Sequence, residues 1–116
     1  MRKIPDKMRS QMSKMASYKR CMRNEVLRDH QCGADPLTGR LIEWEHAWIY
    51  AGKQVNEIWA IISICWWAHR GPGLDKEKNQ FVSLIRATDE ELEKYPRKDW
   101  AQIKKYLTGK YKAYDK

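Results

Sequence analysis

The longest apolar run in the chain covers residues 58–68 and is interrupted only by Ser63. It falls short of the ~18 residues that a membrane-spanning helix needs. Its content of isoleucine and tryptophan is typical of a buried strand, which we expect over residues 58–65. A chain of 116 residues corresponds to one domain and can bury a modest core without disulfide bonds.

The segments around this run predict one further strand and three helices. Residues 40–46 follow a turn-forming cluster and read as a strand, whereas residues 51–57 are polar and ambiguous. Residues 75–86 predict a helix. Thr88 and Glu91 form the pattern of a capping box, and Trp100, Ile103 and Leu107 mark a last helix that ends near Gly109. This order predicts an α+β fold with a very small sheet.

The N-terminal quarter of the chain is strongly basic. Residues 1–28 hold nine basic side chains and two acidic ones, so this segment accounts for most of the net charge of +8. Methionines at helical spacing predict one long helix over residues 6–28, with the methionine face packed in the core. The basic side chains either contact phosphate groups or form a solvated face. The candidate nucleic-acid contacts are Arg9, Lys19, Arg20 and Arg23.

Charge and cysteine content limit the class of partner. The positive charge favours a polyanion, and we expect DNA rather than a membrane because the methionine face lacks Trp, Phe and Leu anchors. The N-terminus has no apolar segment of the kind that directs secretion. Three cysteines, Cys21, Cys32 and Cys65, argue against a secreted disulfide scaffold. Metal binding, catalysis and simple burial remain open for them.

Residues 41–70 combine acidic, histidine and cysteine side chains at informative spacing. Glu45 and His46 are adjacent at the end of the first expected strand, and His69 follows 23 residues later. Cys65 precedes His69 by four residues, and Cys32 lies ahead of the first strand. This pattern resembles the HNH endonuclease family, whose core is a ββα-metal motif, and in particular its small phage and prophage members. The resemblance covers about the middle half of the chain.

The resemblance implies a fold, an activity and roles for single residues. It implies an HNH-like domain over residues 31–116 with C-terminal helices, on which a basic N-terminal helix of residues 1–30 packs. His46 would activate water, while Glu45 and His69 would hold a divalent cation such as Mg²⁺, Mn²⁺, Ni²⁺ or Zn²⁺. The substrate would be DNA, and the protein would work in the cytoplasm of a bacterium or an infected host. Oligomeric state stays open.

Three positions depart from the family pattern. The family's middle asparagine falls near Ala60, and Asn56 is the nearest candidate for its role. A structural zinc site could use Cys21, Cys32 and Cys65, but its fourth ligand falls at Ala68. We therefore expect weak zinc binding, with His30 as a substitute ligand. The further metal ligand falls at Gly73. Its nearest replacements are Asp75, interpreted as a helix cap, and Asn79, interpreted as an exposed helix residue.

Other interpretations of the same residues stay open. The tryptophans at positions 44, 48, 59, 66 and 67 are most simply core residues, and exposed members could stack on unpaired bases. A non-catalytic nucleic-acid-binding module on a degenerate HNH scaffold is the main alternative to the enzyme. A basic helical protein that binds an acidic protein is a third. The enzyme requires Glu45, His46 and His69 together.

Overall fold

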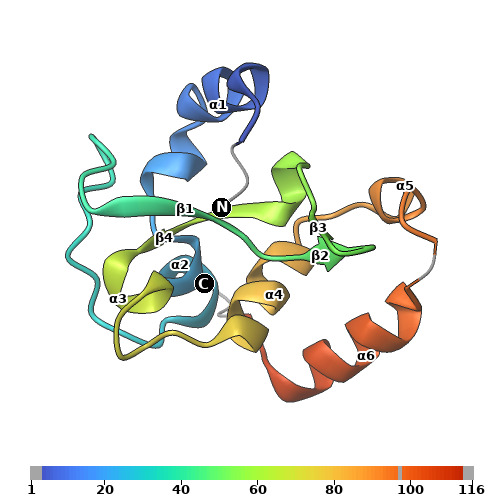
Figure 1. The fold of residues 1–116 in the computed structure, drawn as a ribbon. Coiled ribbons are helices and arrows are strands. Elements are labelled where there is room, and N and C mark those ends of the chain that lie inside the picture. Colours follow the sequence, from blue (N-terminus) through green and yellow to red (C-terminus); the bar gives the residue numbers. More distant parts are fainter. Residues whose placement is uncertain (1–3, 97, 114–116) are drawn as a thin grey trace.

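The computed structural model describes residues 4–96 and 98–113, which form a small mixed α+β globule (Figure 1). This part of the chain contains six α-helices and two antiparallel sheets of two strands each. The α+β class expected from the sequence is confirmed. Arg2 and Lys3, which belong to the basic segment, and residues 114–116 lie outside the described residues. None of the helices described is long and apolar enough to cross a membrane.

The main sheet pairs β1 (Ile42–His46) with β4 (Ile61–Cys65). Its register places Ile42 opposite Cys65 and His46 opposite Ile61. All five residues of β4 are buried, as expected for the longest apolar run, whereas β1 is half-buried. The expected strand over residues 58–65 begins three residues late, because η2 (Ile58–Ala60) is a single 3-10 turn.

A short hairpin follows β1 and accounts for part of the ambiguous polar segment. It consists of β2 (Ile49–Tyr50) and β3 (Lys53–Gln54), which pair directly. The two turn residues, Ala51 and Gly52, have φ values of 52° and 78°. Positive φ at both central positions is the geometry that matches the twist of a two-residue hairpin.

The expected long N-terminal helix is wrong. Residues 6–28 form α1 (Asp6–Ser13), the 3-10 turn η1 (Ala16–Lys19) and α2 (Met22–Leu27). Hydrogen bonds to η2 and β4 hold this segment in place of a continuous helix. The Tyr18 hydroxyl donates to backbone oxygens of Ile58 and Ile61 at 2.6 Å, and Ser63 Oγ donates to those of Ser17 and Arg20. Packing of the methionine face is confirmed, because Met12 and Met22 are buried beside β4.

The C-terminal half is helical, with α3 (Trp66–His69), α4 (Lys76–Leu84), α5 (Asp89–Leu92) and α6 (Trp100–Lys110). The predicted caps are confirmed. Asp75 caps α4 by accepting a bond from the Lys78 amide, and Thr88 forms a capping box with Glu91. A second core cluster packs α4 and α6 around Trp48 and Trp59, so these two tryptophans are core residues as expected.

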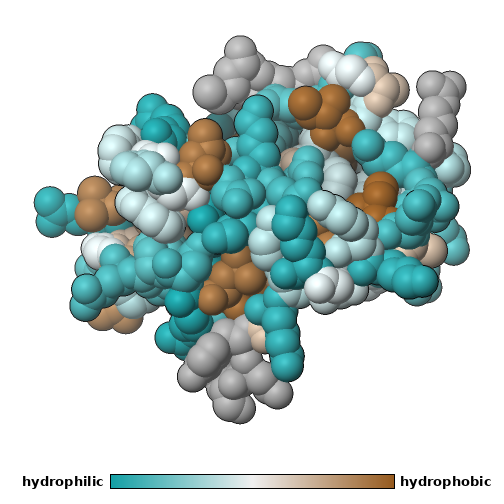
Figure 2. All heavy atoms as spheres, turned by 90° about the horizontal axis from the view of Figure 1, so that it is seen from below, coloured by the Kyte–Doolittle hydropathy of each residue, from teal (hydrophilic) through white to brown (hydrophobic). Residues whose placement is uncertain are grey.

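Figure 2 views the molecule from below Figure 1 and shows a mostly hydrophilic face with separate hydrophobic patches. The N-terminal segment and the rest of the chain share one core, because Met12 and Tyr18 pack with Ile62 and Val82. The most exposed large apolar side chains of the described residues are Leu37, Leu41, Ile49, Trp66, Leu74, Ile85 and Tyr106.

Candidate functional site

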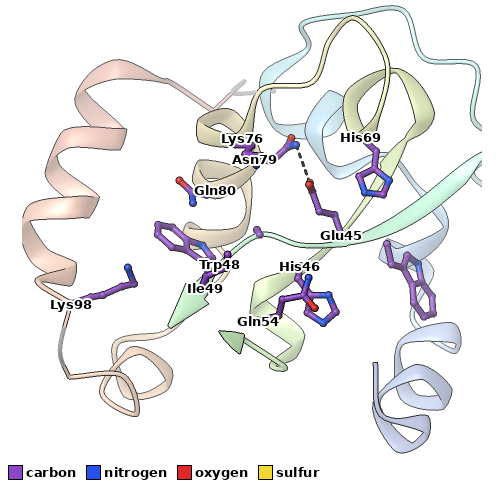
Figure 3. Close-up of a pocket in the computed structure, with 12 residues that line it drawn as sticks. Glu45, His46, Trp48, Ile49, Gln54, His69, Lys76, Asn79, Gln80 and Lys98 are labelled. Carbon is purple, nitrogen blue, oxygen red and sulfur yellow. Dashed lines mark hydrogen bonds between the residues drawn. The ribbon is translucent and has the colours of Figure 1, made fainter. Parts of the chain in front are cut away.

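A cleft of about 440 Å³ opens at the end of β1, beside α3, α4 and the segment before α6 (Figure 3). The three residues on which the sequence argument depends, Glu45, His46 and His69, all line this cleft. The other described lining residues are Trp44, Ala47, Trp48, Ile49, Gln54, Lys76, Asn79, Gln80 and Lys98.

His69 is held by a carboxylate that the sequence analysis missed. His69 Nδ1 donates to Glu43 Oε1 at 2.6 Å, and Glu43 is also paired with Arg70. Hydrogen bonds from Arg70 and His69 hold the pKa of Glu43 below its usual range. Because Nδ1 carries the proton, Nε2 keeps a lone pair, the arrangement common to metal-binding histidines. Glu43 lies two residues before Glu45, so strand alternation places both on one face.

Glu45 is the buried carboxylate of the cleft. Its Oε2 accepts a hydrogen bond from Asn79 Nδ2 at 3.0 Å, and burial raises its pKa. Asn79 is only 1% exposed, so its interpretation as an exposed helix residue is wrong. Asn79 Oδ1 is buried and accepts no hydrogen bond from the described residues. Asn79 therefore meets Glu45 through its amide nitrogen.

His46 is held by the asparagine that the sequence analysis proposed. His46 Nε2 lies 2.6 Å from Asn56 Oδ1. An amide oxygen can only accept, so this contact keeps the proton on Nε2 and leaves Nδ1 as the basic nitrogen. Asn56 follows β3, so the hairpin brings it back to the end of β1.

Glu45 and His46 leave β1 on opposite sides. In Figure 3, Glu45 points toward Asn79 and His69, whereas His46 points to the other side, near Gln54. His46 is the last residue of β1, and the cleft wraps around this strand end so that both side chains line it. The cleft can therefore present a cation ligand and a basic nitrogen to one bound molecule from two directions.

The chemistry of these donors fits a divalent cation. Glu45 supplies a carboxylate and His69 an imidazole nitrogen. The cleft thus offers few metal ligands. Among the described residues, a group of three or more Cys, His, Asp or Glu side chains close enough to share a metal ion occurs at one place, and that place is not this cleft. A cation in the cleft would complete its shell with water or substrate oxygens.

The predicted nucleic-acid contacts have different surroundings. Arg9 and Lys19 are exposed, and Arg20 is paired with Glu25. Arg23 is 1% exposed and paired with Asp29 at 2.8 Å, so its assignment as a DNA contact is wrong. The sequence analysis also missed Lys76 and Lys98, which line the cleft itself.

A second cluster consists of Cys21, His30, Cys32 and Cys65, whose ligand atoms all lie within 4.8 Å of one another. Four ligands around tetrahedral zinc lie roughly 3.5 Å apart, so the cluster is consistent with a structural zinc site. Burial raises the pKa of the Cys21 thiol to about 12. A bound cation would reverse this preference, because a metal-bound thiol loses its proton.

His30 is oriented for this cluster by Asp29. Its Nδ1 donates to Asp29 Oδ1 at 2.8 Å, and its Nε2 lies 3.3 Å from Cys65 Sγ. His30, named from the sequence as a substitute ligand, does join the three cysteines, whereas Ala68 is fully buried in the core. The adjacent Asp-His pair at 29 and 30 is the sequence signal for this ligand.

Comparisons of this chain with models of known protein families, with curated proteins and with solved structures found no match.

Proposed function

We propose that this chain is a metal-dependent endonuclease of the HNH type that hydrolyses DNA phosphodiester bonds. The observation that carries the proposal is a pair of imidazoles in one cleft. Each is fixed through one ring nitrogen by a side-chain oxygen, which leaves the other nitrogen uncommitted. The order β1, β4 and α3 also agrees with the strand–strand–helix succession of a ββα-metal core.

In this proposal Glu45 and His69 hold a divalent cation, and Asn79 positions the Glu45 carboxylate. The cation would stabilise negative charge on the scissile phosphate and on the leaving oxygen. Glu43 keeps His69 in the correct tautomer, and burial of Glu45 keeps bulk water away from its carboxylate. These are contributions of the chain itself, and each can be removed by a single substitution.

His46 acts as the general base. Its Nδ1 accepts a proton from the attacking water as the water oxygen bonds to phosphorus and the bond to the leaving sugar oxygen breaks. Asn56 fixes the ring so that Nδ1 stays available. General-base catalysis contributes about 10²–10⁴-fold to a rate, so this residue carries a large share of the chemical step.

Structural zinc at Cys21, His30, Cys32 and Cys65 completes the proposal. Cys65 ends β4 and Cys21 precedes α2, while His30 and Cys32 lie in the loop before β1. Zinc there would tie three segments together beside the cleft. In a chain with so short a sheet, such a site would contribute directly to folding stability.

Plasmid nicking tests the proposal. Supercoiled plasmid is incubated with the zinc-loaded protein and Mg²⁺, Mn²⁺, Co²⁺ or Ni²⁺, with a brief chelator quench as a control. We expect nicking that requires added cation. His46→Ala, purified identically, should lose nicking but keep its melting temperature and its affinity for DNA, which also excludes a contaminating nuclease. Nicking in the absence of any added cation would contradict the proposed metal-dependent enzyme. The absence of nicking with all four cations would contradict it as well.

A non-catalytic nucleic-acid-binding module is the second candidate. It is favoured by the small ligand set of the cleft, in which Glu45 and His69 are the two strong donors. On this proposal the protein binds DNA with a strong salt dependence and shows no nicking with any cation. The same experiment therefore distinguishes the two candidates.

A further inference from the structure

Two tryptophans that line the cleft each carry a cation on their ring. Arg9 of α1 lies with its guanidinium carbon 5.7 Å from the ring centroid of Trp44. Lys98, before α6, lies with its ammonium nitrogen 5.9 Å from the ring centroid of Trp48. In the sequence, Trp44 precedes Glu45 and His46, and Trp48 follows them. One aromatic ring with one positive charge therefore lies on each side of the two site residues.

The charge inside the cleft has one dominant sign. Lys76 and Lys98 line it together with a single carboxylate, that of Glu45, among the described residues. Arg9 adds a third positive charge next to Trp44. Glu45 is the side chain assigned to a cation, so the remaining charge of the cleft is positive. Such a surface attracts the phosphates of a nucleic-acid backbone.

A neighbouring groove of about 550 Å³ limits this positive surface on one side. It shares Trp48 and Gln80 with the cleft and runs between α4 and α6. Its described lining includes the carboxylates of Glu77 and Asp99 and contains no lysine or arginine. Glu77 is paired with Lys110, so its charge is already balanced, and Asp99 caps α6. Lys98 is therefore the last basic side chain that lines the cleft on this side.

We propose that one nucleic-acid strand crosses the cleft from the Arg9–Trp44 pair to the Lys98–Trp48 pair, with Lys76 beside the second. This inference rests on the proposed function, for which it names the path of the substrate backbone. The scissile phosphate lies over His46 and Glu45, and one phosphate on each side is held by Arg9 or by Lys98.

Salt-dependent DNA binding tests the path without requiring cleavage. The probe is a 16-base-pair duplex, and affinity is measured from 50 to 200 mM KCl with no added divalent cation. Lys98→Gln and Arg9→Gln should each reduce the slope of log affinity against log salt by about one, and the double variant by about two. Lys105→Gln is the matched control, since Lys105 is exposed on α6 and does not line the cleft. Slopes for Lys98→Gln that equal those of Lys105→Gln would overturn the inference.

Cleavage near duplex ends tests the same path by an independent route. The wild-type enzyme should cut poorly within about two nucleotides of either end of a short substrate, because a flanking phosphate is missing there. Arg9→Gln should remove this penalty near one end of the cut strand, 5′ or 3′, and Lys98→Gln near the other. An equal effect of both variants at both ends would contradict a fixed path of the strand, although the proposed nuclease activity would still stand. If no cleavage occurs at all, the proposed function fails and the salt slopes alone decide the inference.

A competition experiment separates nucleic acid from an acidic protein as the partner. Polyglutamate and a single-stranded oligonucleotide of equal charge compete for the labelled duplex. The proposed path predicts that the oligonucleotide displaces the labelled duplex at a several-fold lower concentration than polyglutamate does. Lys98→Gln should reduce this difference in competing concentration. Equal competition by polyglutamate would overturn the assignment of the cleft to a nucleic-acid strand.

Discussion

His46 Nε2 lies 2.6 Å from Asn56 Oδ1, so a side chain ten residues further along the chain fixes the ring of the proposed general base. The hairpin of β2 and β3 makes this contact possible, because it returns the chain to the end of β1. The contact orients the ring and also selects its tautomer. Asn56 is thus a positioning residue whose loss should affect the chemical step more than binding.

Asn56→Ala should lower turnover by about 10- to 100-fold, the usual cost of removing a group that orients a catalytic side chain. Asn56→Asp keeps an accepting oxygen and should retain more activity than Asn56→Ala. The measurements are single-turnover nicking rates, DNA affinity and melting temperature. Unchanged turnover in Asn56→Ala would show that the ring of His46 needs no such support.

Glu43→Ala should weaken binding of a divalent cation in the cleft. Without Glu43, Nδ1 of His69 has no acceptor at 2.6 Å, and the ring is free to turn. Removal of such a group typically costs 10- to 100-fold in metal affinity. Mn²⁺ titration followed by electron paramagnetic resonance measures this directly. Glu93→Ala, an exposed change at the residue that follows α5, is the control and should bind Mn²⁺ like the wild type.

Sequence patterns predicted those parts of the fold that depend on interactions between residues close in the sequence. The caps at Asp75 and Thr88 depend on hydrogen bonds within three residues, and both form as expected. The prediction of one N-terminal helix was wrong because the hydrogen bonds that interrupt it come from residues far away in the sequence. The Tyr18 hydroxyl and Ser63 bond across more than 40 residues, and no periodicity within residues 6–28 reveals those partners.

The same distinction applies to the candidate site. The family resemblance singled out Glu45, His46 and His69, and the structure brings them to one cleft. Of the side chains that orient them, Asn56 was expected from the sequence and Glu43 was not. Lys98 also reaches the cleft from a segment about 50 residues away. Alignment to a family pattern placed the fourth zinc ligand at Ala68, whereas the residue that lies with the three cysteines is His30, the substitute named from the sequence.

Asp29→Asn should weaken zinc binding and destabilise the fold together. Asp29 accepts hydrogen bonds from His30 and from Arg23, whose side chain is almost fully buried. Loss of the negative charge leaves the Arg23 guanidinium without a counter-charge, which typically costs about 3–5 kcal/mol. Competition with a chromophoric chelator measures zinc affinity, and urea unfolding measures stability. Asp89→Asn, at a side chain that is 91% exposed, should change neither.

Ala68→His distinguishes two models of the zinc site. If position 68 were the missing fourth ligand, the substitution would raise zinc content and melting temperature together. The structure predicts the opposite. Ala68 is fully buried, its backbone oxygen accepts a bond from Asn79, and the ligand set already contains His30. An added imidazole overpacks this part of the core, which typically costs about 1–3 kcal/mol.

The wild-type protein should therefore bind one equivalent of zinc, and Ala68→His should lower its melting temperature without adding zinc. Ala101→His, at an exposed position of α6, controls for adventitious binding by a new histidine. His30→Ala is the complementary variant and should lose zinc under the same chelator challenge. A rise in both zinc content and melting temperature for Ala68→His would restore Ala68 as the position of the missing ligand and remove His30 from the site.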